Sequence, residues 1–540
     1  MAIKTVGGKN SGHQRLRKSG TFPPPTVFSP HNNMSNISIA VGQCGLQICD
    51  STMSIVYRGP DYEAPSNTHT DQPMSSAPIG TVQRAMFHTK RTATCSTAST
   101  MGRARGVFVD SEPRVLSTLQ NDKKRPWFSS AGQGIVHEAS GKGNNWAQGY
   151  LQSSQLVQRS MEQIRKEVEA CDWYRGATLY HSLGGGTGSG TGTRIARNMR
   201  DTYKKCGLVS TCVAPSATSE SPVYGYNTML SLWQLQQHVD SIAMFTNDDL
   251  HRRAARAVVG NQETQHVMVD QINIPLSEIN TQCALAISGA IYPTTSSLFS
   301  PFRSTTMQDT ISDVTPIPDM KLVDIRTSVM ALPSDRERQR RSLKQTRSSD
   351  SWARTAKLLL KTIPKFDVEN ERIQTLNQKI IVRGFDDGTQ SPWKSSGTKI
   401  TKRILQTYNP VSWNLDSKTG PLRCVARSTM DTFGGRSMTC VSNRTDAPAL
   451  LRRLHNKTAE MYSANAYVHW FEEHGCDHDF FVEAFESVEK TIEAYWAASQ
   501  RDARVLLQAT VSSSPNKQQP IVLPSSPGTI FVDDYSAITK

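Results

Sequence analysis

The chain has 540 residues, of which 37% are hydrophobic and 20% are charged, a composition typical of globular domains and enough for about three or four of them. Because no stretch approaches ~18 consecutive apolar residues, the sequence predicts no membrane span. The basic N-terminus is followed by no apolar segment, so we expect no secretory signal. Ten cysteines without a Cys-x-x-Cys spacing indicate neither a disulfide framework nor a structural zinc site.

Two segments carry most of the net charge of +14. Residues 1–36 hold five Lys or Arg and no acid, and residues 333–362 hold nine Lys or Arg against three acids. A nucleic-acid surface would spread such cations along a folded groove among aromatic side chains, whereas these lie beside Pro, Ser and Gly. We interpret 1–36 as a disordered extension and 333–350 as a solvated insertion. Contact with an acidic partner, or a targeting role, is the alternative.

Strands and helices are predicted to alternate along the first half of the chain. Strands are expected at 37–41, 177–183 and 208–214, and helices at 151–169, 194–205, 226–239 and 248–258. Such alternation is typical of an α/β fold with a parallel sheet.

Near the C-terminus, apolar residues recur at helical spacing. Phe481, Phe485, Val488, Ile492 and Tyr495 are separated by 4, 3, 4 and 3 positions, which places them on one face of a helix. We expect this face to pack against the core. Residues 512–540 are rich in Ser and Pro, and we interpret them as a tail.

The most specific feature is a glycine loop between a predicted strand and a predicted helix. It comprises Gly184, Gly185, Gly186, Thr187, Gly188, Ser189 and Gly190. Residues without side chains let backbone N–H groups approach an anion closely, and the start of a helix adds about half a positive charge. The Thr and Ser hydroxyls donate further hydrogen bonds. The loop therefore predicts a lysine-free cradle for a di- or triphosphate.

Two other kinds of phosphate-binding loop fail on spacing. A Walker A loop requires GxxxxGK[ST], but neither Gly-Lys pair, at 8–9 and 141–142, is followed by Ser or Thr. A dinucleotide fingerprint requires Gly at i, i+2 and i+5, and no start within 184–190 satisfies all three positions.

Three further loops offer polar groups beside such a cradle. Strand 37–41 runs into 42–45 (GQCG), and 141–146 (GKGNNW) is a small loop that offers amides to phosphate. After an apolar strand come Asp110 and Glu112, two carboxylates that suit Mg²⁺ or its waters beside phosphate. Each of these signals is weak alone, and a plain turn is the alternative.

The order of these motifs resembles the tubulin superfamily, and GGGTGSG is similar to its signature loop. The segments that resemble its first three nucleotide loops are 37–48, 108–113 and 141–150. Residues 465–496 look like its two C-terminal helices. The segments 383–393 and 409–414, together with the absence of an acidic C-terminal run, are similar to the delta class of the family, with the gamma or epsilon class as the alternative.

The resemblance implies a tubulin/FtsZ-like α/β fold with a parallel sheet, a core helix, an α+β intermediate domain and a C-terminal helical hairpin. The implied organisation is a disordered basic extension at 1–36, a GTP-binding domain at 37–246, a core helix and intermediate domain at 247–442 with the basic insertion at 333–350, C-terminal helices at 443–511 and a tail at 512–540.

Members of this family bind GTP or GDP with Mg²⁺, and the resemblance assigns residues of this chain to that site. Contacts with phosphate and guanine-side groups are implied for Gln43, Cys44 and Gln47. Contacts with phosphate are implied for Gly143, Asn144, Asn145 and the loop from Gly184 to Gly190. Asp110 and Glu112 would lie near the magnesium ion.

The base and the ribose are assigned in the same way. Asn247 and Asn273 resemble the two asparagines that pair with the edge of guanine, where a carboxamide supplies both a donor and an acceptor. The segment similar to the ribose loop is one residue short, so Ser219 and Glu220 would replace its usual glutamate.

Hydrolysis in this family is completed by a neighbouring subunit. The resemblance places Asp309 at the position of the catalytic acid, and a carboxylate there orients or deprotonates the attacking water. The alternative is that Asp309 only caps a helix or forms an interface pair.

The resemblance thus implies a GTP-binding protein of the cytoplasmic cytoskeleton, at centrioles, basal bodies or flagella. Its implied partners are other tubulins, through longitudinal contacts, and microtubule or centriolar proteins. A polymerising GTPase subunit of gamma or epsilon type is the alternative. A nucleic-acid-binding protein that uses the basic segments is a third, and the charge distribution argues against it.

Overall fold

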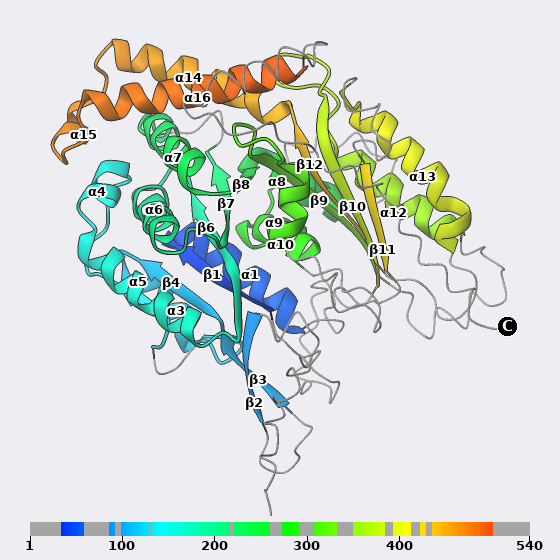
Figure 1. Ribbon diagram of the computed structural model, residues 1–540, viewed down its shortest axis with the longest axis horizontal. Helices are drawn as coiled ribbons and strands as arrows, with labels where there is room; N and C mark the ends of the chain where they lie inside the picture. Colours follow the sequence, from blue (N-terminus) through cyan, green and yellow to red (C-terminus); the bar gives the residue numbers. More distant parts are fainter. Residues whose placement is uncertain are drawn as a thin grey trace, which may run out of the picture. The chain divides into compact units, whose positions relative to one another are not determined.

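The computed structural model describes residues 34–58, 86–91, 99–128, 132–215, 221–259, 273–291, 307–331, 349–383, 392–411, 422–427 and 435–499. Within these ranges, ten strands form one sheet in the order β11-β10-β12-β9-β8-β7-β6-β1-β4-β5 (Figure 1). No helix in this part of the chain is long and apolar enough to cross a bilayer. The sheet confirms the predicted α/β class.

Six neighbouring strands of the sheet run parallel. They are β1 (Met34–Val41), β4 (Gly106–Asp110), β5 (Ile135–His137), β6 (Trp173–Ser182), β7 (Gly207–Ala214) and β8 (Ser241–Thr246). Both faces of β1 are buried, since Ile39 packs in one apolar cluster with Trp146 while the next residue, Ala40, packs in another with Leu46. Burial on both faces explains why these strands read as continuous apolar runs.

Helices join these strands and cover the sheet. They are α1 (Gly42–Arg58), α3 (Pro113–Asn121), α4 (Trp146–Leu151), α5 (Ser154–Glu169), a π-helical turn (Gly186–Thr191), α6 (Gly192–Thr202), α7 (Tyr224–His238) and α8 (Asn247–Val259). A hairpin of β2 (Phe87–Arg91) and β3 (Ser99–Ala104) is separate from the main sheet. The helix predicted at 151–169 is α5, which starts later because α4 ends at Leu151.

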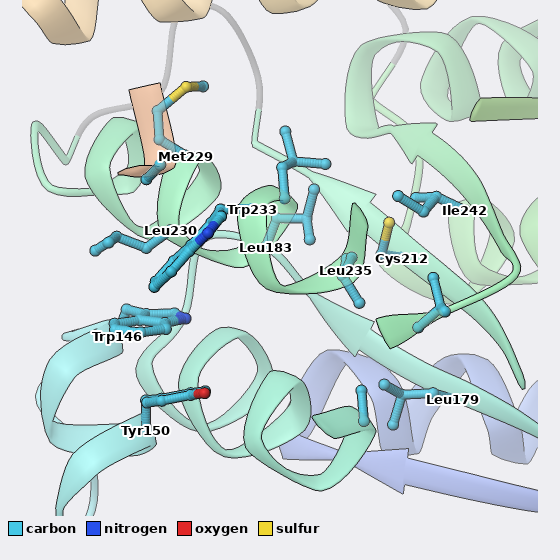
Figure 2. Close-up of a cluster of buried hydrophobic side chains, with 14 of the residues drawn as sticks. Trp146, Tyr150, Leu179, Leu183, Cys212, Met229, Leu230, Trp233, Leu235 and Ile242 are labelled. Atoms are coloured by element: carbon cyan, nitrogen blue, oxygen red, sulfur yellow. The ribbon is translucent and has the colours of Figure 1, made fainter. Parts of the chain in front are cut away.

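One of the apolar clusters joins α4 to α7. Figure 2 shows Trp146 and Tyr150 of α4 near Leu230 and Trp233 of α7. The rings of Trp146 and Tyr150 stack with their centroids 4.3 Å apart. The ring centroid of Trp146 also lies 6.1 Å from that of Phe480, near the C-terminus, so an aromatic contact joins the short helix α4 to the rest of the core.

The second part of the chain begins with the core helix α9 (Leu276–Ile291), after α8. Its other elements are α10 (Met307–Val314), β9 (Leu322–Ala331), α12 (Ser349–Thr362), β10 (Thr375–Arg383), α13 (Pro392–Tyr408), β11 (Leu422–Arg427) and β12 (Gly435–Arg444). β12 runs antiparallel to both β9 and β10. Two residue pairs, Ile242 with Leu322 and Ala243 with Val323, join this mixed sheet to the parallel one.

The C-terminal helices are α14 (Asp446–Ser463), α15 (His469–Glu472) and α16 (His478–Ser499), and α14 and α16 pack against α7 (Figure 1). The predicted apolar stripe of α16 is confirmed. Phe481, Val488, Ile492 and Tyr495 are buried, and Phe485 is partly buried against the same cluster.

Several predicted segments lie wholly or mostly outside the described residues. They are the N-terminal extension up to residue 33, the basic insertion up to residue 348 and the tail at 512–540. Two of these predicted segments overlap a strand or a helix at their C-terminal ends. β1 begins at Met34, inside the segment 1–36, because Asn36 on this strand donates from Nδ2 to Thr178 Oγ1 of β6 at 3.1 Å. Likewise α12 begins at Ser349, inside 333–350.

A buried charge network joins α8 to β9, β12 and α14. Its members are three acids and three arginines: Asp249, Arg253, Asp324, Arg326, Arg444 and Asp446. Burial alone would raise the pKa of Asp324, but Arg326, Arg253 and Arg444 hold it below its usual value. Because Asp249 and Arg253 of α8 pair with Arg326 and Asp324 of β9, the network links the first part of the chain to the second. Its three acids and three arginines carry equal and opposite formal charge.

Candidate functional site

The predicted loops meet at one edge of the sheet. β5, β4, β1 and β6 are consecutive neighbours and parallel, so their carboxyl ends share an edge, where α/β proteins bind ligands. The four segments that the sequence singled out lie at these carboxyl ends: 141–146 after β5, 108–113 at the end of β4, 42–45 in the first turn of α1 after β1, and 184–190 after β6. Two contacts bring the loops together. A Cβ on Gly42 would lie 3.0 Å from Gly188 N, and Ser111 Oγ lies 2.6 Å from Thr187 Oγ1.

The glycine loop is more regular than predicted. Only its first two residues are outside helical structure, because Gly186–Thr191 forms a π-helical turn that continues into α6 at Gly192. Such turns are rare and often found at functional sites. Ser189 N donates to Gly185 O at 3.1 Å, and most of the turn is buried. One continuous helix, the π-helical turn followed by α6, therefore starts shortly after the end of β6, with the positive potential that favours an anion.

The loop after β5 is fitted closely to the glycine turn. Gly143 and Asn144 both adopt left-handed φ values, of 53° and 51°, which Gly and Asn tolerate better than other residues. Asn145 caps α4, since its Oδ1 accepts from Ala147 N at 2.8 Å. A Cβ on Gly186 would overlap Lys142 O. The contact leaves no room for a side chain between the two loops.

The two carboxylates predicted near magnesium lie at the end of β4. Asp110 is buried, and burial raises its pKa to about 6 although the amides of Glu112 and Ser111 favour the charged form. Glu112 lies over the adjacent loop, because a Cβ on Gly141 would meet Glu112 Oε1 at 2.5 Å. Within the described ranges no group of three or more His, Cys, Asp or Glu is placed to hold a metal. Two carboxylates fit Mg²⁺, which keeps several waters and binds substrate phosphates.

The first turn of α1 carries the residues predicted to contact phosphate and base. Gln43 is exposed, and Cys44 and Gln47 are half-buried. Burial raises the pKa of the Cys44 thiol to about 12, so this cysteine is a neutral packing group at physiological pH. Gln47 Oε1 accepts from Asn280 Nδ2 at 3.4 Å, which links α1 to the core helix α9.

The two asparagines assigned to the base are exposed at helix starts. Asn247 follows β8 and begins α8, and β8 lies two strands from β6 in the sheet. At ~4.8 Å between neighbouring strands, β8 is about 10 Å from β6, and the two parallel strands end at the same edge. Asn273 lies three residues before α9. The contacts in the described part of the chain do not join either asparagine to the four loops.

Three predicted residues are not described in full. Ser219 and Glu220 lie outside the described residues. Asp309 lies in the first turn of α10. Thr315, directly after this helix, has its Oγ1 2.9 Å from Ser241 Oγ at the start of β8. The helix that carries Asp309 therefore ends at the opposite edge of the sheet from the glycine turn.

Polar residues that the sequence reading missed also support the site. Asn227 of α7 bonds to both the glycine loop and the loop before α4, Ser111 bonds to Thr187, and the Tyr224 ring packs on Gly184. The sequence holds a weak signal for Asn227. It is a polar residue near the start of a helix whose next two turns, Met229–Leu235, are mostly apolar.

His181, at the end of β6, supports the turn from below. Its Nδ1 donates to Gly188 O at 3.0 Å, and Ser210 Oγ donates to its Nε2 at 2.8 Å. Burial lowers the pKa of His181 to about 4, although the carbonyls of Gly188 and Ser182 favour the protonated ring. The imidazole is therefore neutral in the folded protein at pH 7.

This buried neutral histidine predicts a loss of stability in mild acid. The unfolded chain protonates His181 below about pH 6.5, whereas the folded protein resists protonation until about pH 4. Stability from this group is therefore complete above pH 6.5 and falls by roughly 3 kcal/mol on the way to pH 4. Urea unfolding at several pH values should show this slope, and His181→Gln should flatten it. An equal slope in the variant would contradict the assignment.

Comparisons with known proteins agree with this geometry. Residues 35–255 match the Tubulin/FtsZ family, GTPase domain. The tubulin delta chain of Canis lupus familiaris is 26% identical over 486 residues, covering 86% of this chain and 99% of that protein. The tubulin delta chain of Homo sapiens is 26% identical over 495 residues, with the same coverage. The tubulin beta-1 chain of Homo sapiens is 26% identical over 412 residues, covering 75% of this chain and 82% of that protein.

The family match covers the four loops at the carboxyl edge, the glycine turn and the start of α8. Similarity to the delta chains extends over almost their whole length and over 86% of this chain, so it reaches well beyond the GTPase domain. Residues 35–255 of this chain therefore form a GTPase domain of the Tubulin/FtsZ family, and the chain is similar to tubulin delta chains over almost their whole length.

Proposed function

We propose that this protein binds GTP or GDP as a cytoskeletal subunit of the tubulin family. The observation that carries the proposal is the convergence of four segments at one edge of the sheet. One of them is the glycine turn, which lies at a strand-to-helix junction. Backbone amides and the helix start supply the attraction for phosphate, as in a cradle that needs no lysine. Lys142, inside the loop before α4, pairs with Glu138 at 2.8 Å.

Each loop has a part in this site. The residues that would hold phosphate are Gly143, Asn144, Asn145 and the turn from Gly184 to Gly190. Gln43, Cys44 and Gln47 would reach the phosphate and guanine-side groups, and Asn247 and Asn273 would read the base, with Ser219 and Glu220 at the ribose. Mg²⁺, when bound, neutralises phosphate charge, and Asp110 and Glu112 are the residues that would hold it or its waters.

A thermal-shift titration tests nucleotide binding. GDP and GTP should raise the melting temperature in proportion to the logarithm of their concentration, and GMP should do so only at much higher concentration, because the loops hold phosphates. ADP should have less effect if the asparagines read guanine. Equal shifts with ADP and GDP would remove the guanine assignment but leave the phosphate site.

The finer assignment is to a delta-type tubulin that acts in the assembly or maintenance of centrioles, basal bodies or axonemes. Its support is the length over which the delta chains align. Its place would then be the cytoplasmic cytoskeleton at the centriole, basal body or flagellum, with other tubulins as longitudinal partners. Localisation of a tagged chain to the spindle or to interphase microtubules alone would favour another class.

We further propose that hydrolysis is completed between subunits. α10 ends at the edge opposite the glycine turn, so Asp309 would serve a neighbouring molecule. Phosphate release should rise with protein concentration, and Asp309→Ala should reduce it by about 10²-fold or more, as loss of a general base does. Asp313→Ala is the matched control on the same helix, where Asp313 pairs with Lys379 at 2.9 Å. Equal loss in both variants would indicate damage to α10.

The second candidate is a polymerising GTPase of gamma or epsilon type. The beta-1 chain is 26% identical to this chain, as is a delta chain, but over a shorter span. Percentage identity alone therefore does not distinguish the delta class from other classes of tubulin. Sedimentation of the pure protein with GTP separates the two, because a self-polymer pellets above a critical concentration. A delta-type subunit that needs other tubulins should stay in the supernatant alone.

A further inference from the structure

One buried carboxamide ties two of the site's loops together. Asn227, in the first turn of α7, has no exposed surface. Its Oδ1 accepts from Trp146 N at 2.9 Å, and its Nδ2 donates to Asn144 O at 2.7 Å and to Gly184 O at 2.6 Å. One side chain therefore bonds to the end of the loop before α4 and to the start of the glycine loop.

The bonding partners fix the orientation of the amide. An N–H of Trp146 needs an acceptor, and the carbonyls of Asn144 and Gly184 need donors, so only one assignment of Oδ1 and Nδ2 satisfies all three. A carboxamide offers two donors and an acceptor oxygen, and Asn227 uses both donors and the oxygen. Aspartate lacks the donors, and leucine lacks every polar group.

Without Asn227, which acts as a clamp between the two loops, the backbone that it bonds to would be unfavourable in free energy. Asn144 has a left-handed φ of 51°, and burying an unbonded carbonyl or amide costs about 1–3 kcal/mol. Asn227 satisfies Asn144 O and Gly184 O at the point where each loop turns. Asn145 is held separately, because its Nδ2 donates to Trp470 O at 2.8 Å.

We infer that Asn227 is a positioning residue that holds the loop before α4 and the glycine loop as one rigid phosphate-binding surface. The inference rests on the proposed function, and it adds a residue that touches no nucleotide to those that would. Pre-organised amides lose little entropy on binding a di- or triphosphate. Without the clamp, the two loops would have to be ordered by the nucleotide itself, which would weaken its affinity.

The test compares two alanine substitutions of adjacent buried polar residues. Thr228 is also fully buried, but its Oγ1 bonds within its own helix to Tyr224 O at 2.7 Å. Calorimetric titration with GDP, at a temperature where circular dichroism shows both variants folded, should give about tenfold weaker binding or worse for Asn227→Ala. Thr228→Ala should stay within about twofold of wild type.

Hydrogen exchange separates local loosening of the two loops from a general loss of stability. In Asn227→Ala the amides of 141–146 and 184–190 should exchange faster, while those of α16 should not change. Wild-type GDP affinity in Asn227→Ala would overturn the inference, whereas a wild-type protein that is stripped of nucleotide, still folded and ignores GDP would overturn the proposed function. Should the variant not fold, wild-type exchange decides: GDP should protect both loops together, and protection of the glycine loop alone would refute the clamp.

Discussion

Gly186→Ala is expected to abolish measurable GDP binding and to lower the melting temperature. A Cβ at this position would overlap Lys142 O and lie 2.9 Å from Asn145 N, and both of these atoms belong to the backbone of the neighbouring loop. Backbone cannot rotate away as a side chain does, so the two loops must separate. Overpacking of this kind costs about 1–3 kcal/mol of folding free energy, and the phosphate-binding amides are displaced with it.

Gly192→Ala is the matched control for this result. Gly192 begins α6 directly after the turn, with helical φ and ψ, and the three atoms nearest to its Cβ would be atoms of His181 at 3.5 Å, an ordinary van der Waals contact. Alanine favours a helix over glycine, so the control should bind GDP normally and melt at or above the wild-type temperature. Loss of binding in both variants would mean that the whole segment, rather than the fit between loops, is sensitive. Normal binding by Gly186→Ala would contradict the arrangement of the site.

Asp324→Asn is expected to cause the largest loss of folding stability, about 3–5 kcal/mol, because it removes one of the three carboxylates that offset three buried arginines. Asp324 contacts Arg253 at 3.0 Å, Arg326 at 2.5 Å and Arg444 at 3.5 Å. The Nη atoms of Arg326 and Arg253 are also held by Asp249. The asparagine keeps the shape but removes the charge, so three arginines would share two carboxylates.

Denaturant unfolding measures this loss, and acid titration checks its cause. Burial opposes the charged form of Asp324, but the three arginines hold its pKa below the usual value, and the same balance lowers the pKa of Asp249. Stability from these groups is therefore present at neutral pH and is lost as the pH falls below about 4. The variant should lose part of this acid dependence. Arg165→Ala removes an exposed ion pair, and it should change little.

The parts of the site that could be predicted from the sequence are those encoded locally. The loop from Gly184 to Gly190 combines a strand before it, a helix after it and residues without side chains, and these three signals lie within about twenty positions. The carboxylates after β4 and the loop before α4 were found for the same reason. Their grouping into one site was implied by the family resemblance, and the structure accounts for it because parallel strands share a carboxyl edge.

The parts that could not be predicted depend on distant contacts. Asn227 bonds to residues up to 83 positions away, and its one local signal, a polar residue at the start of a largely apolar helix, does not distinguish it from a capping asparagine. Arg326 sits on β9, where a charged residue reads as a solvent-facing position, because its partner Asp249 comes from a helix 77 residues earlier. The sequence predicts an open loop where the π-helical turn lies, because glycine gives no helical signal. In the structure, close packing against α4 favours the helical form.

The central claim is that backbone amides at the end of β6 hold a guanosine polyphosphate, and mass spectrometry of nucleotide released from the purified protein tests it most directly. The account predicts GDP or GTP at close to one molecule per chain, and little after Gly186→Ala. A wild-type protein that releases no nucleotide, and whose melting temperature does not respond to added GTP, would contradict the claim and leave a tubulin-like fold without its ligand.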